Sequence, residues 1–242
     1  MTLENKIALV TGASRGIGRA AAVALATAGA HVVLVARTVG GIEEADDEIR
    51  KAGGQATLVP LNLKDFEALD RLGASIFERW GRLDAFFGNA GVLGAVTPLA
   101  HLDPKLFQEL LDINVTANWR LIRSLDPLLR RSEAGRVLFV SSGAARKHRP
   151  YWGGYAMSKA ALTSLALTYA AECEGTAIKV NLLDPGPTRT AMRAKAMPGE
   201  DPQTLPPPEA LASLIVEMLS PSYQKNGELV AFHKNHQRKP TP

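Results

Sequence analysis

The sequence predicts a single domain, residues 1–242, built on a parallel, doubly wound α/β sheet. Short apolar runs alternate with longer amphipathic segments along almost the whole chain. Repeated alternation of this kind is typical of parallel sheets, because each crossover between two strands carries a helix. The apolar runs are nearly continuous, without alternating polar residues, which indicates a sheet covered on both faces. No repeat of solenoid period and no linker divides the chain.

The strands are expected where a run is β-branched or aromatic and too short for a helix. Seven segments fit this description: 6–10, 31–36, 56–61, 83–87, 136–141, 178–183 and 228–232. Helical patterns lie between them, at 16–28, 42–52, 65–80, 104–131, 155–173 and 208–219. Glycines follow the first three helices, Asp65 is expected to cap the third, and Pro104 after Asp103 is a start signal for the fourth.

Two segments stand outside this pattern. The proline-rich stretch 197–210 is expected to be a loop within the domain, because the last helix and strand follow it. Long loops of this kind often close over substrates, so we expect residues 192–210 to form a substrate-loop region. The last residues, 233–242, are expected to form a flexible basic tail.

Composition excludes several classes of protein. The net charge is only +4 and the positive residues are scattered, which does not favour a nucleic-acid partner. One cysteine excludes an intrachain disulfide, and no His, Asp or Glu cluster has metal-ligand spacing, so no metal is expected. The N-terminus MTLENKIALV resembles neither a signal peptide nor a membrane span. We therefore expect a cytoplasmic protein with no membrane partner.

A glycine-rich turn, LVTGASRGIGRAAA, joins the first strand to the first helix. Gly12, Gly16 and Gly18 allow a tight turn and let the backbone approach an anion closely. The helix N-terminus offers free N–H groups and a positive dipole end to a pyrophosphate. A purely structural turn is the alternative, but the position between strand and helix favours a dinucleotide site.

Two arginines bear on which dinucleotide would bind. A carboxylate that holds the adenine ribose is expected about 20 residues after the glycine loop. No acid occurs between Gly18 and Glu43; Arg37 stands at that place, and Arg15 lies inside the glycine loop. Guanidinium groups suit a 2′-phosphate, which a carboxylate would repel. The alternative is two solvated arginines, but the pattern favours NADP(H) over NAD(H).

A second constellation carries proton chemistry. Tyr155 and Lys159 stand four residues apart at the start of a predicted helix, so they share one face. A nearby ammonium lowers the pKa of a phenol, whose reference value is about 10. Ser142, thirteen residues before Tyr155, ends the fifth strand and could hold a substrate oxygen. Alone, a tyrosine and lysine at this spacing are more often structural.

These motifs together, in this order, resemble the short-chain dehydrogenase/reductase family over residues 5–232. The glycine motif is Thr11 to Gly18, the family's N-N-A-G appears as GNAG at 88–91, and Tyr155 and Lys159 match its Y-x3-K. The helix asparagine matches Asn114, and the catalytic serine matches Ser142, not Ser141. Two departures are Gly88 in place of the first asparagine, and Asn62 where the family often has an acid.

The resemblance implies a Rossmann fold with strand order 3-2-1-4-5-6-7 and hydride transfer between NADP(H) and a carbonyl or secondary alcohol. It implies that Tyr155 is the general acid or base, Lys159 lowers its pKa, Ser142 positions the substrate oxygen and Asn114 supports a proton relay. The implied cofactor contacts are Gly12, Ser14, Arg15, Gly16, Ile17, Gly18, Arg37, Asn62, Leu63, Asn89, Ala90, Gly91, Tyr155, Lys159, Pro185, Gly186, Thr188 and Thr190.

The substrate is less constrained than the cofactor. Pocket walls are expected from Leu93, Ala144, Trp152 and Met192, although Trp152 could equally pack at a subunit contact. The basic stretch 146–149 is either a solvated loop or a surface that steers an acidic substrate. Helices 104–131 and 155–173 are expected to form a homodimer or homotetramer contact. The competing hypothesis for the whole chain is a non-catalytic dinucleotide-binding sensor or scaffold.

Overall fold

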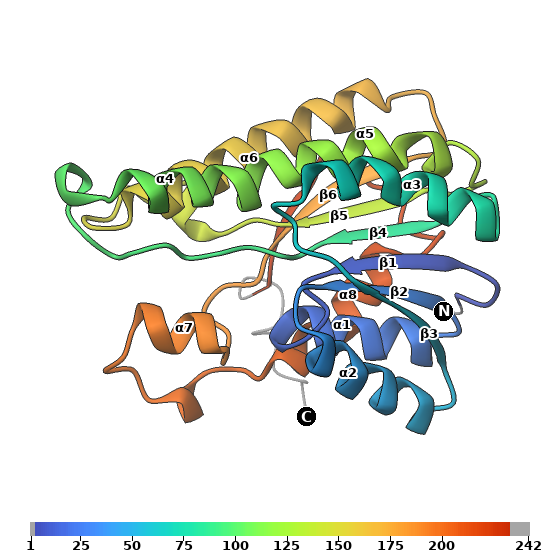
Figure 1. Cartoon of the computed structure of the whole chain (residues 1–242), viewed down its shortest axis with the longest axis horizontal. Coiled ribbons are helices and arrows are strands. Elements are labelled where there is room, and N and C mark those ends of the chain that lie inside the picture. Colours follow the sequence, from blue (N-terminus) through green and yellow to red (C-terminus); the bar gives the residue numbers. More distant parts are fainter. Residues whose placement is uncertain (1–2, 233–242) are drawn as a thin grey trace, which may run out of the picture.

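The computed structural model describes residues 3–232, and it confirms the predicted α/β sheet of seven strands. All neighbouring strands are parallel, in the predicted order β3-β2-β1-β4-β5-β6-β7 (Figure 1). The strands are β1 Ile7–Thr11, β2 His31–Ala36, β3 Gln55–Pro60, β4 Ala85–Gly88, β5 Arg136–Val140, β6 Lys179–Asp184 and β7 Leu229–Ala231. The expected tail at 233–242 lies outside the described residues.

Helices cover both faces of the sheet (Figure 1). One face carries α1 Gly16–Thr27, α2 Val39–Lys51 and α8 Ala212–Met218; the other carries α3 Phe66–Trp80, α5 Ala117–Leu129 and α6 Gly153–Glu172. Each layer of helices encloses its own apolar core against the sheet. The central strands β1, β4 and β5 are buried along their whole length, as their continuous apolar runs predict.

Local sequence signals explain several helix ends. The Asp65 carboxylate accepts a hydrogen bond from the Ala68 N–H at 3.0 Å, as the cap prediction requires, and Gly81 ends α3 with φ of +70°. Asp103 caps α4 (Pro104–Leu111) by accepting from the N–H groups of Lys105 and Leu106 at 2.8 and 3.1 Å. Side-chain caps therefore set the starts of both helices.

The helix predicted over 104–131 is present from Pro104 to Leu129, but it is not one regular α-helix. A π-helical turn, Asp112–Thr116, separates α4 from α5. In this turn the Asn114 carbonyl accepts a hydrogen bond from Asn118 Nδ2 at 3.0 Å, and the Asn114 side chain bonds the backbone of Val92. These side-chain bonds satisfy groups that the change of helical pitch displaces.

The segment 197–210 is more ordered than the expected loop. It follows the short helix α7 Ala191–Ala196 and contains two 3-10 turns, η4 Pro202–Thr204 and η5 Pro208–Leu211. The predicted helix at 208–219 begins as a 3-10 turn and becomes α-helical only at Ala212. Figure 1 shows α7 standing apart from the sheet, beside the carboxyl ends of the strands.

The strand order places the functional edge of the sheet. Sequence order reverses between β1, which leads to β2, and β4, which leads to β5 on the other side. At such a switch point the loops after the two strands diverge and open a crevice at the carboxyl edge. Within residues 3–232, no helix is both long and apolar enough to span a membrane.

Candidate active site

The glycine loop after β1 has the conformation that its glycines predict. Gly12 and Gly16 have φ of +67° and +56°, in the left-handed region that other residues adopt at a cost. A Cβ at Gly18 would lie 2.2 Å from the Gly12 carbonyl oxygen and 2.5 Å from Asn89 Nδ2. The start of α1 is therefore pressed against its own loop, with Ile17 packed partly on the core.

The loop after β4 holds the glycine loop in place. Thr11 Oγ1 accepts hydrogen bonds from the N–H groups of Asn89 and Ala90, both at 3.1 Å. Asn89 Nδ2 donates to the Thr11 carbonyl at 2.9 Å. Asn89 therefore joins the two loops at the switch point, a role that its predicted contact with a cofactor did not include.

Gly88, the first departure from the family motif, has a packing reason. A Cβ here would lie 2.4 Å from Cδ1 of Phe139 and 3.1 Å from Oδ1 of Asn118. The Phe139 ring and the Asn118 amide thus occupy the space that an asparagine at position 88 would need. Gly91 is similarly confined, because a Cβ there would lie 3.1 Å from Asn114 Oδ1 and 3.4 Å from Lys159 Nζ.

We expect Gly18→Ala to destabilise the fold by about 1–3 kcal/mol, the usual cost of overpacking. The added methyl group cannot fit without moving the Gly12 carbonyl or the Asn89 amide. The free energy of unfolding in urea measures this effect. Gly40→Ala is the matched control for stability, because Gly40 is also helical, lies outside the left-handed region and has nothing within 4 Å of an added Cβ. Equal stability of Gly18→Ala and wild type would contradict the packing described.

Arg15 and Arg37 flank the glycine loop as exposed cations. Arg15 is the residue just before α1, and Arg37 directly follows β2. Within residues 3–232 neither guanidinium takes part in an ion pair. Ser14 lies in the same loop and packs closely on Gly41 of α2. Both cations are therefore available to an anion at this edge.

The residues predicted to contact adenine lie after β3. Asn62 is exposed, and its Oδ1 accepts from the Lys64 N–H at 3.1 Å. Leu63 packs partly on the core beneath α3 and α5. Neither side chain carries a charge that would oppose a 2′-phosphate.

Ser142, Tyr155 and Lys159 come together at the carboxyl ends of β5 and β6. Ser142 hydrogen-bonds the Tyr155 side chain, and Lys159 is buried with its Nζ donating to the Val140 carbonyl at 2.8 Å. Ser141 is also buried, but its hydroxyl bonds Thr163 at 2.8 Å. Of the two serines, Ser142 is therefore the one placed beside the Tyr155 side chain.

Asn114 lies behind Lys159 in the π-helical turn. Its Oδ1 accepts from the Val92 N–H at 2.8 Å, and its Nδ2 donates to Ser158 Oγ at 2.9 Å. Ser158 immediately precedes Lys159 on α6, and its hydroxyl donates to the Tyr155 carbonyl at 2.9 Å. A chain of hydrogen bonds thus ties Asn114 to the turn of α6 that carries the tyrosine.

Burial and charge act on the two titratable groups. Burial raises the pKa of Tyr155, the Asp184 carboxylate raises it further, and the hydrogen bond from Ser142 lowers it. Burial lowers the pKa of Lys159 to about 8, so its ammonium is charged at neutral pH. The influences on Tyr155 do not include Lys159, so the expected lowering of the tyrosine pKa by that residue stays a prediction.

The segment after β6 lies beside the glycine loop. Gly186 has φ of +63°, and the buried Thr188 donates through Oγ1 to the Pro185 carbonyl at 3.2 Å. Thr190 caps α7, and its Cγ2 would be 3.5 Å from a Cβ at Gly16. The predicted contacts with the nicotinamide end are therefore placed across the crevice from the phosphate loop.

An apolar cluster surrounds Tyr155. Leu93, Ala144 and Trp152, all predicted wall residues, belong to it, and the Trp152 ring centroid lies 6.1 Å from that of Tyr155. The cluster also includes Val92, which adjoins the predicted wall residue Leu93, and Ala196, from the predicted substrate-loop region 192–210. Its remaining member, Leu110, is one that the sequence reasoning missed. Leu110 stands one helical turn before Asn114, and this spacing could have placed its side chain on the helix face that carries Asn114. Met192 lies exposed on α7, outside the cluster.

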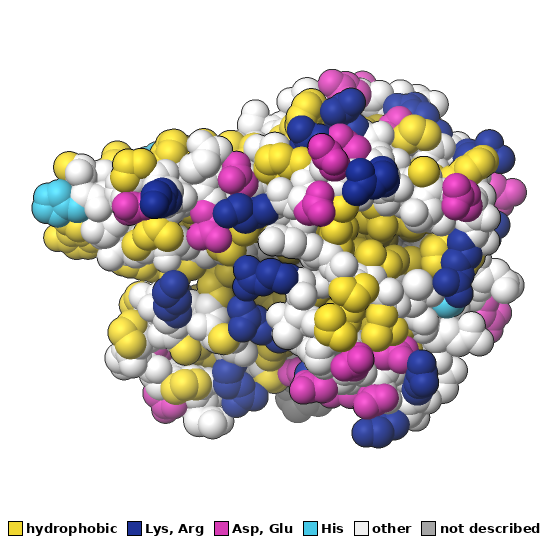
Figure 2. Space-filling view, in the orientation of Figure 1, with side chains coloured by type: hydrophobic (Ala, Val, Ile, Leu, Met, Phe, Trp, Pro, Cys, Tyr) yellow, Lys and Arg dark blue, Asp and Glu magenta, His cyan; other side chains and the backbone are white. Residues whose placement is uncertain are grey.

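The space-filling view shows a hollow between two lobes at this edge. Figure 2 shows apolar side chains within it and Lys and Arg side chains along its border. The two lobes carry α4 and α7, by comparison with Figure 1. The hollow is where a substrate would reach the cluster around Tyr155.

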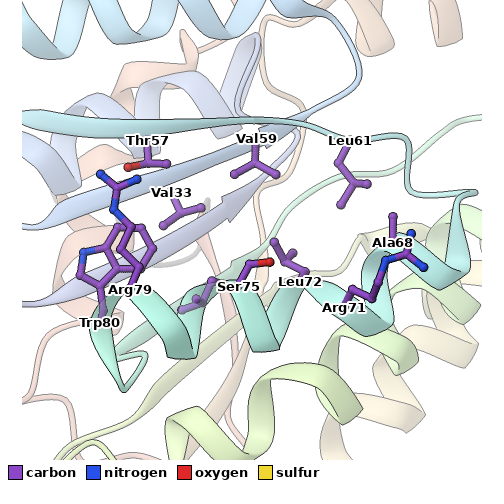
Figure 3. Close-up of a pocket in the computed structure, with 11 residues that line it drawn as sticks. Val33, Thr57, Val59, Leu61, Ala68, Arg71, Leu72, Ser75, Arg79 and Trp80 are labelled. Carbon is purple, nitrogen blue, oxygen red and sulfur yellow. The ribbon is translucent and has the colours of Figure 1, made fainter.

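A separate cavity of about 330 Å³ lies between α3 and strands β2 and β3 (Figure 3). Val33, Val59 and Leu61 form its apolar wall, with Arg71 and Arg79 on the helix side. None of the candidate site residues lines it. It forms because β3 is the edge strand and is only partly covered. No group of three His, Cys, Asp or Glu residues suited to a metal occurs within 3–232.

Comparisons with known proteins agree with this arrangement. A family model described as short chain dehydrogenase matches residues 6–201. The uncharacterized oxidoreductase YciK of Escherichia coli strain K12 is 38% identical over 242 residues, covering 98% of this chain and 95% of the relative. Solved structures from Pseudomonas syringae and Shigella flexneri 2a strain 301 have TM-scores of 0.92 and 0.91 at 41% and 38% identity.

Both structures match over nearly their whole length. The alignments cover 95% of this chain in each case, with 95% of the Pseudomonas chain and 97% of the Shigella chain. The Shigella structure is complexed with NADP. With the glycine loop, Ser142, Tyr155 and Lys159 in place, the chain belongs to the short-chain dehydrogenase family.

Proposed function

We propose that this protein is an NADP(H)-dependent oxidoreductase that interconverts a carbonyl compound and a secondary alcohol. The observation that carries the proposal is the meeting of Ser142, Tyr155 and the buried Lys159 at the switch-point edge of the sheet. A binding module needs a nucleotide cleft but has no use for a phenol and an ammonium beside it. This is the reason to prefer catalysis over a sensor or scaffold.

The residues present fit NADP(H). Neither Gly12 nor Gly18 has room for a Cβ, which would lie 2.9 and 2.5 Å from Asn89 Nδ2, so these glycines permit the tight turn that presents the N-terminus of α1 to a pyrophosphate. Arg15 and Arg37 offer two guanidinium groups, without ion pairs among the described residues, to a 2′-phosphate. Bound NADP(H) would supply or accept the hydride.

The side chains would then handle the proton. In reduction Tyr155 donates its phenolic proton to the developing alkoxide, and in oxidation its phenolate accepts the proton of the alcohol. Ser142 holds the same oxygen by a hydrogen bond. Lys159 keeps a positive charge near the tyrosine and would bind ribose hydroxyls. Asn114 anchors this end of α6 and would hold a water that connects Lys159 to solvent.

Neighbouring segments would form the substrate pocket and the oligomer. Leu93, Ala144, Trp152 and Met192 would line the pocket, with residues 192–210 as its movable wall. A homodimer or homotetramer through 104–131 and 155–173 is supported by exposed apolar side chains on these helices: Phe107, Trp119 and Leu167. We place the enzyme in the cytoplasm, as its single cysteine suggests.

The test is turnover with a panel of substrates in both directions. We expect loss of NADPH absorbance with at least one class of ketone, and its gain from NADP⁺ with the matching secondary alcohol. NADH in place of NADPH should give a lower kcat/KM. Tight NADPH binding with no turnover in either direction, across chain lengths and polarities, would favour the sensor or scaffold.

A further inference from the structure

A buried carboxylate lies beside the proposed active site and has a single cationic partner. Asp184, the last residue of β6, is 7% exposed. Its Oδ2 accepts from Arg146 Nη2 at 2.8 Å, and its Oδ1 accepts from the Gly186 N–H at 3.1 Å. The Arg146 side chain is 48% exposed, so the carboxylate of the pair is buried whereas the guanidinium faces water.

This ion pair joins two walls of the site. Arg146 directly follows the 3-10 turn Gly143–Ala145, which Ser142 caps by accepting from the Ala144 N–H at 3.2 Å. Asp184 directly precedes the segment 185–190, which faces the glycine loop. A Cβ at Gly143 would lie 3.3 Å from Asp184 Oδ2, so the carboxylate touches the turn that carries Ser142.

The pair also changes the reading of the basic stretch 146–149. Arg146 is committed to a carboxylate of its own chain, so it is not a free cation that attracts an acidic substrate. Exposed ion pairs contribute little, but removing one partner of a buried group leaves an uncompensated charge in a poorly solvated place. Here the Asp184 charge raises the pKa of Tyr155, so a change in its neutralisation would reach the phenol.

We propose that Arg146 is a positioning residue that neutralises Asp184 and thereby sets how readily Tyr155 releases its proton. The pair affects the ionisation of the reacting phenol through its charges, in addition to holding two loops together. The proposal deepens the proposed function, on which it rests for the role of Tyr155. Its direct test, however, needs neither cofactor nor substrate.

Other charges near α6 set the background. Lys159 is on α6 itself, one turn from Tyr155, and stays unchanged in every variant below. The remaining charged residues of α6, of the elements packed against it or the Tyr155 cluster, and of the loop after Arg146 are Lys105, Glu109, Asp112, Arg120, Arg123, Asp126, Arg136, Lys147, His148, Arg149, Glu172, Lys179, Arg193 and Lys195. Arg193 is already paired with Glu200.

The experiment measures the ionisation of Tyr155 in the apo protein. With ¹³Cζ-labelled tyrosine, the four tyrosines give four NMR signals whose shifts report phenolate formation. Tyr155→Phe assigns the signal of interest by its disappearance. The signal is then followed from neutral pH up to the alkaline limit of the folded state in four proteins: wild type, Arg146→Gln, Asp184→Asn and the double variant.

The expected shifts have opposite signs. Arg146→Gln leaves the carboxylate alone, which disfavours the phenolate, so Tyr155 should titrate at higher pH than in wild type. Asp184→Asn leaves the guanidinium alone, so Tyr155 should titrate at lower pH. The double variant has neither charge and should return close to wild type.

The results would differ if the ion pair acted only by holding the two loops together. Either single variant would then loosen the site in the same way, so both midpoints would move in one direction or not at all, and that result overturns the proposal. Arg82→Gln is the control: it removes one of the two cationic partners of Asp84, the other being Lys6, and Asp84 is a carboxylate 3% exposed at the opposite end of the strands. It should lower thermal stability and leave the Tyr155 titration unchanged.

Activity separates this inference from the function on which it rests. If reductase turnover is found, the alkaline loss of kcat/KM should move to higher pH in Arg146→Gln, because the protonated phenol persists longer. Opposed NMR shifts without turnover would support the pair and count against the proposed function. Turnover with unchanged NMR midpoints would support the proposed function and count against the role of the ion pair.

Discussion

Tyr155→Phe should lower the rate of carbonyl reduction by about 10²–10⁴-fold, the usual contribution of a positioned general acid. Phenylalanine keeps the ring that packs against Trp152 and Leu93, so the apolar cluster should survive. Only the hydroxyl is lost, together with its hydrogen bond to Ser142. The change therefore removes the proton donor while leaving the pocket and the glycine loop in place.

Two measurements check this expectation. The Kd of NADPH, from its fluorescence on titration, should stay within a few-fold of wild type, while kcat falls. Tyr151→Phe is the matched control, because Tyr151 is an exposed loop residue four positions earlier and is 58% exposed. A variant at Tyr155 that retained most of its turnover would show that another group donates the proton.

The fold was predictable because its signals are local. The continuous apolar runs at β1, β4 and β5 are buried strands, and Asp65 and Asp103 cap helices as their sequence context predicts. The π-helical turn was not predictable, because it depends on Val92. That residue is 22 positions from Asn114 and joins it only after β4 and α5 have packed together.

The site can be divided in the same way, into features that local spacing predicts and contacts between distant parts of the chain. The glycine loop and the Ser142, Tyr155 and Lys159 set depend on short spacings along the chain. The ion pair of Arg146 and Asp184 spans 38 positions, so no short spacing along the chain could predict it. Gly88 is similar: its smallness is explained by Phe139 and Asn118, which reach it from β5 and α5.

Arg37→Asp should shift the cofactor preference toward NAD(H), lowering the NADP/NAD ratio of kcat/KM by about 100-fold. Loss of a charge-assisted hydrogen bond to the 2′-phosphate costs about 1.5–3 kcal/mol, and a carboxylate at the same place adds repulsion. For NAD(H) the new carboxylate can accept from the ribose hydroxyls. Arg37 is exposed directly after β2 and pairs with no acid among the described residues, so its removal breaks no ion pair of the fold.

The measurement is kcat/KM for NADPH and NADH with one carbonyl substrate at fixed ionic strength. Lys51→Asp, at the far end of α2, makes the same charge change away from the cleft and should leave the ratio unchanged. Because Arg15 remains in the glycine loop, some preference for the phosphate should persist, and Arg15→Gln combined with Arg37→Asp should lower the ratio further. An unchanged ratio in Arg37→Asp would mean that the 2′-phosphate is held elsewhere, and the loop after β2 would then lose its assigned role.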